Sequence, residues 1–151
     1  WPRDQIRDVA GSGVLVPREE QRTVSAISWA SNKWAHLDDG ETAILRVSAG
    51  HADDPTPIDL DDGTLLERVV ADVADITRIS GPPNDVRISR WRDGFPQYEV
   101  GHLSRCDAVD HALRDSGSNI AVTGAGHRGL GIPACIRQGR DAARLVMGAA
   151  S

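Results

Sequence analysis

Apolar and polar residues alternate in several short runs along the chain. Three runs in the first third are rich in β-branched residues and are separated by charged or glycine-containing connectors, which is typical of antiparallel strands joined by hairpins. They predict strands at 13–17, 23–29 and 42–48. A later alternating run predicts another strand at 86–91, and a short apolar run predicts a last one at 119–123.

Three other stretches follow a helical period. The first begins after Asp61, a residue type that caps helices, and its apolar residues form one stripe: Leu65, Leu66, Val69, Val70, Val73 and Ile76. Further helices are predicted at about 103–114 and 132–147. Strands followed by helices predict an α+β fold with a largely antiparallel or mixed sheet and helices packed on it.

Composition narrows the function classes. The 151 residues carry 17 basic and 22 acidic side chains without a basic cluster, which argues against nucleic acid as a partner. No apolar run is long enough for a transmembrane segment, and we expect a cytoplasmic location.

The only methionine is Met147, so we expect the chain to be a piece of a longer product. Cys106 and Cys135 lie in apolar helical patterns and are predicted to be core thiols, not a disulfide.

A glycine-rich loop precedes the last predicted helix. Gly124, Gly126 and Gly129 have the G-x-G-x-x-G spacing of dinucleotide-binding loops. A Rossmann unit also needs a second parallel strand with an acidic residue, which this stretch does not provide. The start of the helix would still present unpaired N–H groups and a positive dipole end to a partly negative group. The alternative is that the glycines only turn the chain.

Six motifs occur in order along almost the whole chain, at 11–16, 28–34, 90–91, 96–98, 101–102 and 129–136. In sequence and spacing they resemble the protoporphyrinogen/coproporphyrinogen oxidases, FAD enzymes of the amine-oxidase-like superfamily. The resemblance implies that 1–116 is the C-terminal part of a substrate-binding domain. It also implies that 117–151 is the final strand, loop and helix of an FAD-binding domain.

The same resemblance implies which residues contact FAD. Backbone N–H groups around Leu130, Gly131 and Ile132 would face the flavin pyrimidine edge and ribityl chain. The full set of implied cofactor contacts is Gly124, Ala125, Leu130, Gly131, Ile132 and Pro133. The parent enzyme would oxidise a porphyrinogen with O2, releasing H2O2, in haem biosynthesis, and the coproporphyrinogen-using branch matches better. Without the rest of the cofactor site, the isolated chain would be inactive.

Candidate substrate contacts are fewer. Aromatic walls and cations suit a macrocycle that bears carboxylates, and the candidates are Lys33, Trp34, Arg46 and Tyr98. Ordinary sheet packing with solvated charges is the alternative reading of these residues. Either a peripheral membrane contact or a homo-oligomer of the parent is left open.

No catalytic side chain can be assigned from spacing. His127 lies in the glycine-rich loop, where its ring would approach the flavin or point to water. His102, Cys106 and His111 form a poor metal site because a fourth ligand and the usual short repeats are missing, so no metal is expected. Two other functions stay open: a flavin amine or polyamine oxidase, and a non-enzymatic α+β binding module.

Overall fold

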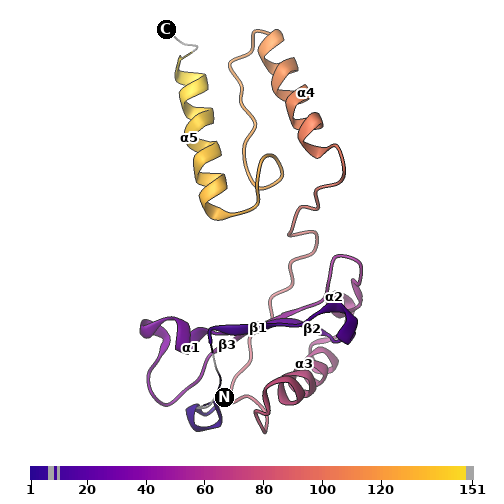
Figure 1. Cartoon of the computed structure of the whole chain (residues 1–151), viewed down its shortest axis with the longest axis vertical. Coiled ribbons are helices and arrows are strands. Elements are labelled where there is room, and N and C mark those ends of the chain that lie inside the picture. The colour runs from indigo at the N-terminus through magenta and orange to yellow at the C-terminus, as the bar shows by residue number, and fades with distance from the viewer. Residues whose placement is uncertain (7–8, 10, 149–151) are drawn as a thin grey trace. The chain divides into compact units, whose positions relative to one another are not determined.

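Three antiparallel strands form the sheet, in the order β1-β2-β3: β1 (Gly13–Leu15), β2 (Val24–Trp29) and β3 (Leu45–Ala49) (Figure 1). The computed structural model describes residues 1–6, 9 and 11–148. The chain divides into two units, Trp1–Arg92 with the sheet and Asp93–Ser151 with the last two helices. The strands predicted at 13–17, 23–29 and 42–48 are confirmed, with β1 ending before Pro17.

Helices supply the rest of the regular structure. The long ones are α3 (Asp62–Thr77), α4 (His102–Asp115) and α5 (Ile132–Gly148), all three as predicted from periodicity. Short ones are α1 (Ala30–Lys33), α2 (Thr56–Asp59) and the 3-10 turns Arg3–Ile6, Arg18–Glu20 and Ala35–Leu37. The mixture of helices with an antiparallel sheet confirms the α+β fold class.

Helix α3 has well-defined ends. Asp61 caps it, because its Oδ1 accepts the Thr64 N–H at 3.0 Å and its Oδ2 accepts the Thr64 hydroxyl at 2.7 Å. These bonds stabilise the carboxylate and lower the pKa of Asp61. At the other end Arg78 adopts a left-handed conformation, and its N–H bonds the Ala74 carbonyl at 2.8 Å. The predicted cap is therefore confirmed.

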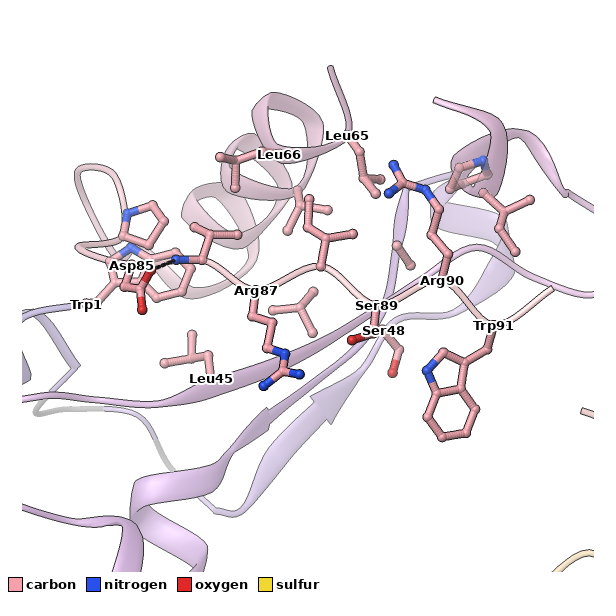
Figure 2. A pocket seen from close by; sticks show the side chains of 18 residues that line it. Trp1, Leu45, Ser48, Leu65, Leu66, Asp85, Arg87, Ser89, Arg90 and Trp91 are labelled. Atoms are coloured by element: carbon pink, nitrogen blue, oxygen red, sulfur yellow. Dashed lines mark hydrogen bonds between the residues drawn. The ribbon is translucent and has the colours of Figure 1, made fainter. Parts of the chain in front are cut away.

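The strand predicted at 86–91 is wrong. This segment runs beside α3 and β3 without pairing to any of the described strands (Figure 2). The Arg90 guanidinium bonds the Asp62 carboxylate and donates to the Leu60 carbonyl oxygen at 2.7 Å. Arg90 thus ties the segment to the start of α3. Alternation of apolar residues signals a half-buried extended chain, but a strand also needs a hydrogen-bonded neighbour.

The strand predicted at 119–123 is also wrong. Residues 119–123 connect α4 to the glycine-rich loop without a ladder to another described segment. Ile120 and Val122 are exposed, 57% and 44% respectively. A buried-type apolar run becomes a strand only where a neighbouring strand accepts its backbone hydrogen bonds, and the described residues of this unit contain none.

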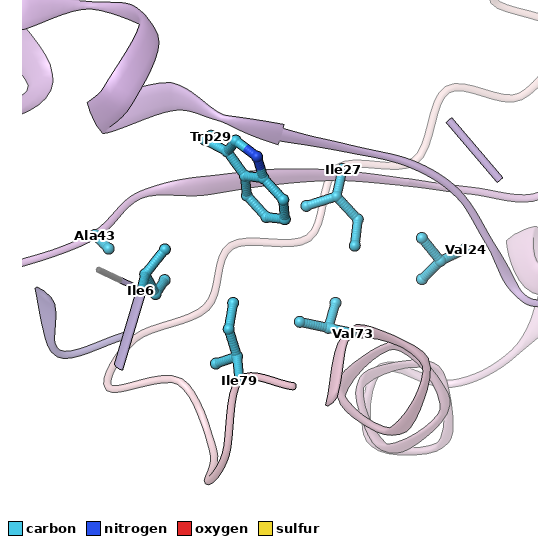
Figure 3. Close-up of a cluster of buried hydrophobic side chains, with 7 residues drawn as sticks. All are labelled: Ile6, Val24, Ile27, Trp29, Ala43, Val73 and Ile79. Carbon is cyan, nitrogen blue, oxygen red and sulfur yellow. The ribbon is translucent and has the colours of Figure 1, made fainter. Parts of the chain in front are cut away.

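The core of the first unit lies between the sheet and α3. It consists of seven buried residues, shown in Figure 3: Ile6, Val24, Ile27, Trp29, Ala43, Val73 and Ile79. Val24 and Ile27 are both buried although strict alternation would put them on opposite faces. The pairing of β2 with β3 shifts register between Val24 and Ala26, and such a bulge turns the following side chains to the other face. Asp72 of α3 also accepts the Val24 N–H at 3.0 Å, which fixes the helix to β2.

The second unit consists of α4, α5 and the connection at 116–131. Cys106 is buried as predicted, whereas Cys135 is only half-buried and not a core residue, and both are free thiols. The apolar side of α5 is largely open, since Ile132 is 77% and Ile136 is 51% exposed. Within the described part of the chain, no helix combines the length and apolar character that a bilayer crossing requires.

The boundary between the two units falls between Arg92 and Asp93, whereas the expected functional boundary is at 116/117. That expected boundary divides substrate-binding from FAD-binding residues and stays a prediction. In the structure α4 belongs to the same unit as the glycine-rich loop.

Candidate functional site

The glycine-rich loop at 124–131 is the candidate site. Gly124 and Gly129 have φ angles of +117° and +128°, values that side chains strongly disfavour. A Cβ on Gly129 would also lie 2.9 Å from the Ala134 Cβ at the start of α5. Glycine is therefore required at 129 both by the backbone and by the close approach to the helix.

The end of the loop leaves backbone donors open. Within the described residues, the N–H groups of Leu130, Gly131 and Ile132 have no acceptor, while the Cys135 N–H already bonds the Gly131 carbonyl at 2.9 Å. Gly131 and Ile132 are exposed. The first N–H groups of a helix and its positive dipole end favour a partly negative ligand group.

The loop is held from the α4 side by Tyr98, His102 and Cys106. The Tyr98 hydroxyl donates to the Ala125 carbonyl at 2.5 Å and accepts the Gly129 N–H at 2.9 Å. His102 Nε2 lies 2.6 Å from the His127 carbonyl oxygen, a contact that requires the proton on Nε2. The Cys106 thiol donates to the same oxygen at 3.3 Å.

Asp110 of α4 anchors the two side chains in the middle of the loop. Its Oδ1 lies 3.2 Å from His127 Nε2, and its Oδ2 accepts from the Arg128 guanidinium at 2.7 Å. Arg128 also donates to Asp107 at 2.6 Å. Hydrogen bonds from Arg128, with a smaller effect from His127, keep the pKa of Asp110 below its usual value. The carboxylate is therefore charged at neutral pH, and its contribution to stability is lost only as the pH falls through that lowered pKa.

His127 points inward. The ring is buried and bonded to Asp110, so it does not point to water, which was one of the two expected positions. Its contacts are those of an anchoring side chain.

The predicted cofactor contacts lie together in this loop, from Gly124 and Ala125 to the first turn of α5 with Pro133. Their chemistry suits a flavin, because three backbone N–H groups without an acceptor lie at the start of a helix. Gly131 has no side chain, which leaves space beside these donors. A Cβ on Gly131 would meet nothing nearer than Pro133 Cδ at 3.8 Å. Their contact with FAD stays a prediction.

The predicted substrate contacts belong to both units of the chain. Lys33 and Trp34 adjoin each other at the end of α1, with the Lys33 Nζ 5.8 Å from the Trp34 ring centroid, and Arg46 lies on β3. Tyr98 belongs to the second unit, where its hydroxyl bonds the loop. The role of these four residues in substrate binding stays untested.

The first unit has a pocket of about 400 Å³ between β3, α3 and 83–91 (Figure 2). Leu45, Leu65 and Leu66 contribute apolar surface, while Arg87 and Trp91 also line it. None of the four predicted substrate residues lines this pocket. Within the described residues, no group of three or more His, Cys, Asp or Glu side chains is placed to hold a metal ion.

A family model described as flavin-containing amine oxidoreductase matches residues 1–147. The chain belongs to this family. Flavin is therefore the cofactor of the family, and the expected oxidoreductase class is confirmed. Because this is a family of oxidoreductases, the alternative of a non-enzymatic binding module does not fit it.

Several proteins similar to this chain are named coproporphyrinogen III oxidases. The chain is 33% identical over 132 residues to a coproporphyrinogen III oxidase of Bacillus subtilis, an alignment that covers 87% of this chain and 28% of the relative. It is 34% identical over 125 residues to that of Mycobacterium bovis, covering 83% of this chain and 26% of the relative. The predicted resemblance to porphyrinogen oxidases is thereby confirmed, while the chain spans less than a third of these relatives.

A solved structure supports the fold. A protein from Exiguobacterium sp. 255-15, provisionally named a protoporphyrinogen oxidase, superposes with a TM-score of 0.79 at 26% identity. The match covers 93% of this chain and 31% of that protein. The α+β arrangement of this chain is thus one that occurs within a larger porphyrinogen oxidase-like protein.

Three further residues that hold the loop could not be predicted from the sequence: Asp107, Asp110 and Gln138. Gln138 Oε1 accepts the Arg128 N–H at 3.1 Å, and its Nε2 donates to the Gly129 carbonyl at 3.3 Å. In the sequence these are ordinary helix-surface residues. The one available signal is the spacing of Asp107 and Asp110, which puts two carboxylates on one helix face, but nothing local indicates that Arg128 would reach them.

Proposed function

We propose that this chain is part of an FAD-dependent oxidase that dehydrogenates a porphyrinogen to the porphyrin. Coproporphyrinogen III is the preferred substrate and protoporphyrinogen IX the second candidate. The observation that supports this proposal is the set of open N–H groups at Leu130, Gly131 and Ile132. It occurs in a chain that belongs to a flavin family and is similar to coproporphyrinogen III oxidases.

In this proposal 117–151 contributes to the flavin site and 1–116 to the substrate domain. When bound, the flavin supplies the two-electron chemistry. The residues of this chain would bind and orient it: the Leu130, Gly131 and Ile132 N–H groups would donate to the flavin, whose pyrimidine edge becomes more negative on reduction. Fixed donors aimed at developing charge stabilise it without reorganisation at the moment of reaction.

The overall reaction balances as three two-electron steps. Six electrons and six protons leave the porphyrinogen, and three O2 molecules accept them to give three H2O2. We assign no acid or base to this chain, since the buried His127 is committed to Asp110.

The test uses the full-length protein that carries this chain. We expect it to purify with a bound flavin spectrum, which bleaches under anaerobic conditions with coproporphyrinogen III and not with amines. Air should then restore the spectrum with formation of H2O2. A colourless protein that binds no FAD would contradict the flavin function, and bleaching by amines alone would favour the amine oxidase alternative.

The kcat/KM values for the two porphyrinogens distinguish between the two candidate substrates. The similarity to coproporphyrinogen III oxidases favours the first. We therefore expect a higher kcat/KM for coproporphyrinogen III than for protoporphyrinogen IX in steady-state oxygen consumption. The reverse order would assign the protein to the other branch.

A further inference from the structure

Tyr98 and Gln138 hold the same residue of the loop from two different segments of the chain. The Gly129 N–H donates to the Tyr98 hydroxyl at 2.9 Å, and the Gly129 carbonyl accepts from Gln138 Nε2 at 3.3 Å. Tyr98 precedes α4, and Gln138 is on α5. Both peptide groups that flank the Gly129 Cα are therefore fixed by side chains.

Fixing these peptide groups also sets the direction of the next donor. The Gly129 carbonyl and the Leu130 N–H belong to one planar trans peptide, so they point in opposite directions. When Gln138 binds the carbonyl, the Leu130 N–H must point away from Gln138. The bond from the Cys135 N–H to the Gly131 carbonyl fixes the Ile132 N–H in the same way.

The Tyr98 hydroxyl is largely occupied by this arrangement. A phenol has one donor and two acceptor positions, and Tyr98 uses its donor on Ala125 and one acceptor on Gly129. The two bonds close the loop over 125–129. The ring is itself fixed, because it stacks on His102 with a centroid distance of 4.0 Å and an interplanar angle of 9°.

We propose that Tyr98 and Gln138 are positioning residues that clamp Gly129 and thereby aim the Leu130 N–H, with its neighbours, at the flavin. This rests on the proposed function. It gives Tyr98 a role different from the substrate contact expected from sequence, and it assigns Gln138 a role for the first time.

The test compares Tyr98→Phe and Gln138→Leu with the wild type in the full-length protein. The control is Ser116→Ala, which removes a hydroxyl that donates to the Leu113 carbonyl at 2.8 Å at the far end of α4. Tyr98→Phe keeps the ring and its stacking on His102. The measurements are the FAD dissociation constant, KM for coproporphyrinogen III, and amide hydrogen exchange of 125–132 in the FAD-free protein.

If the clamp positions the flavin donors, both variants should raise the FAD dissociation constant by about fivefold to tenfold, as the loss of about one net hydrogen bond implies. Amide exchange in the loop should accelerate by a similar factor, and KM should change by less than about twofold. The control should match the wild type in all three measurements.

Two results would overturn the clamp. A raised KM with unchanged FAD affinity in Tyr98→Phe would make Tyr98 a substrate contact, and unchanged exchange in both variants would show that Gly129 does not depend on them. Failure of the proposed function is distinct: a full-length wild type that binds no FAD would refute the flavin role, whereas the exchange measurement in the same protein would still test the clamp.

Discussion

At the scale of single residues, Gly129 combines the strictest requirements of the loop. Its φ is +128°, and a methyl group at this position would lie 2.9 Å from the Ala134 Cβ, so there is no room for a side chain. We predict that Gly129→Ala destabilises the second unit by roughly 1–3 kcal/mol. Urea unfolding followed by circular dichroism measures this change.

Gly126 provides the matched control for that substitution. A Cβ at 126 would meet nothing within 4 Å, and Gly126 is not among the residues with positive φ. Gly126→Ala should therefore change stability by less than about 0.5 kcal/mol. Equal effects of the two substitutions would mean that the loop tolerates side chains generally, contrary to the geometry described.

At the scale of elements, the N-terminal cap of α3 should contribute to the stability of the first unit, because α3 is the only long helix in the described part of that unit. We predict that Asp61→Ala lowers the Tm by roughly 5 °C, since two hydrogen bonds at the helix start are lost. Asp61→Asn should retain most of the stability, because Asn caps helices about as well as Asp does. Thermal unfolding at pH 7 gives the comparison.

The same cap has a defined pH dependence. The folded-state pKa of Asp61 is lowered, so the carboxylate's contribution is fully present above the ordinary Asp pKa and is lost as the pH falls through the lowered value. The advantage of wild type over Asp61→Ala should therefore shrink in strong acid. An advantage that stays constant down to about pH 2 would exclude the charged cap as its source.

At the scale of the whole molecule, the loop offers only part of a dinucleotide site. The sheet of the described residues is wholly antiparallel, whereas a dinucleotide-binding βαβ unit needs parallel strands. The chain also spans 28% of the Bacillus subtilis relative. We predict that the chain alone retains no FAD after gel filtration, while the full-length protein treated identically does. A stoichiometric flavin absorption band in the isolated chain would contradict this.

The sequence by itself determined the elements whose signals are local. Periodicity located α3, α4 and α5, the Asp61 cap followed from residue type, and collinear motifs identified the family. Local signals suffice here because helix periodicity, capping and family motifs are each written within a short stretch of chain.

Only the tertiary structure decided the features that depend on contacts between distant segments of the chain. The apolar runs at 86–91 and 119–123 are not strands, because pairing needs a neighbour that no single stretch of sequence specifies. Asp110 binds His127 and Arg128 across 17 and 18 positions, and Tyr98 reaches Gly129 across 31. Such contacts form when the fold brings distant segments together, so spacing along the chain indicated the glycine-rich loop but not the side chains that hold it.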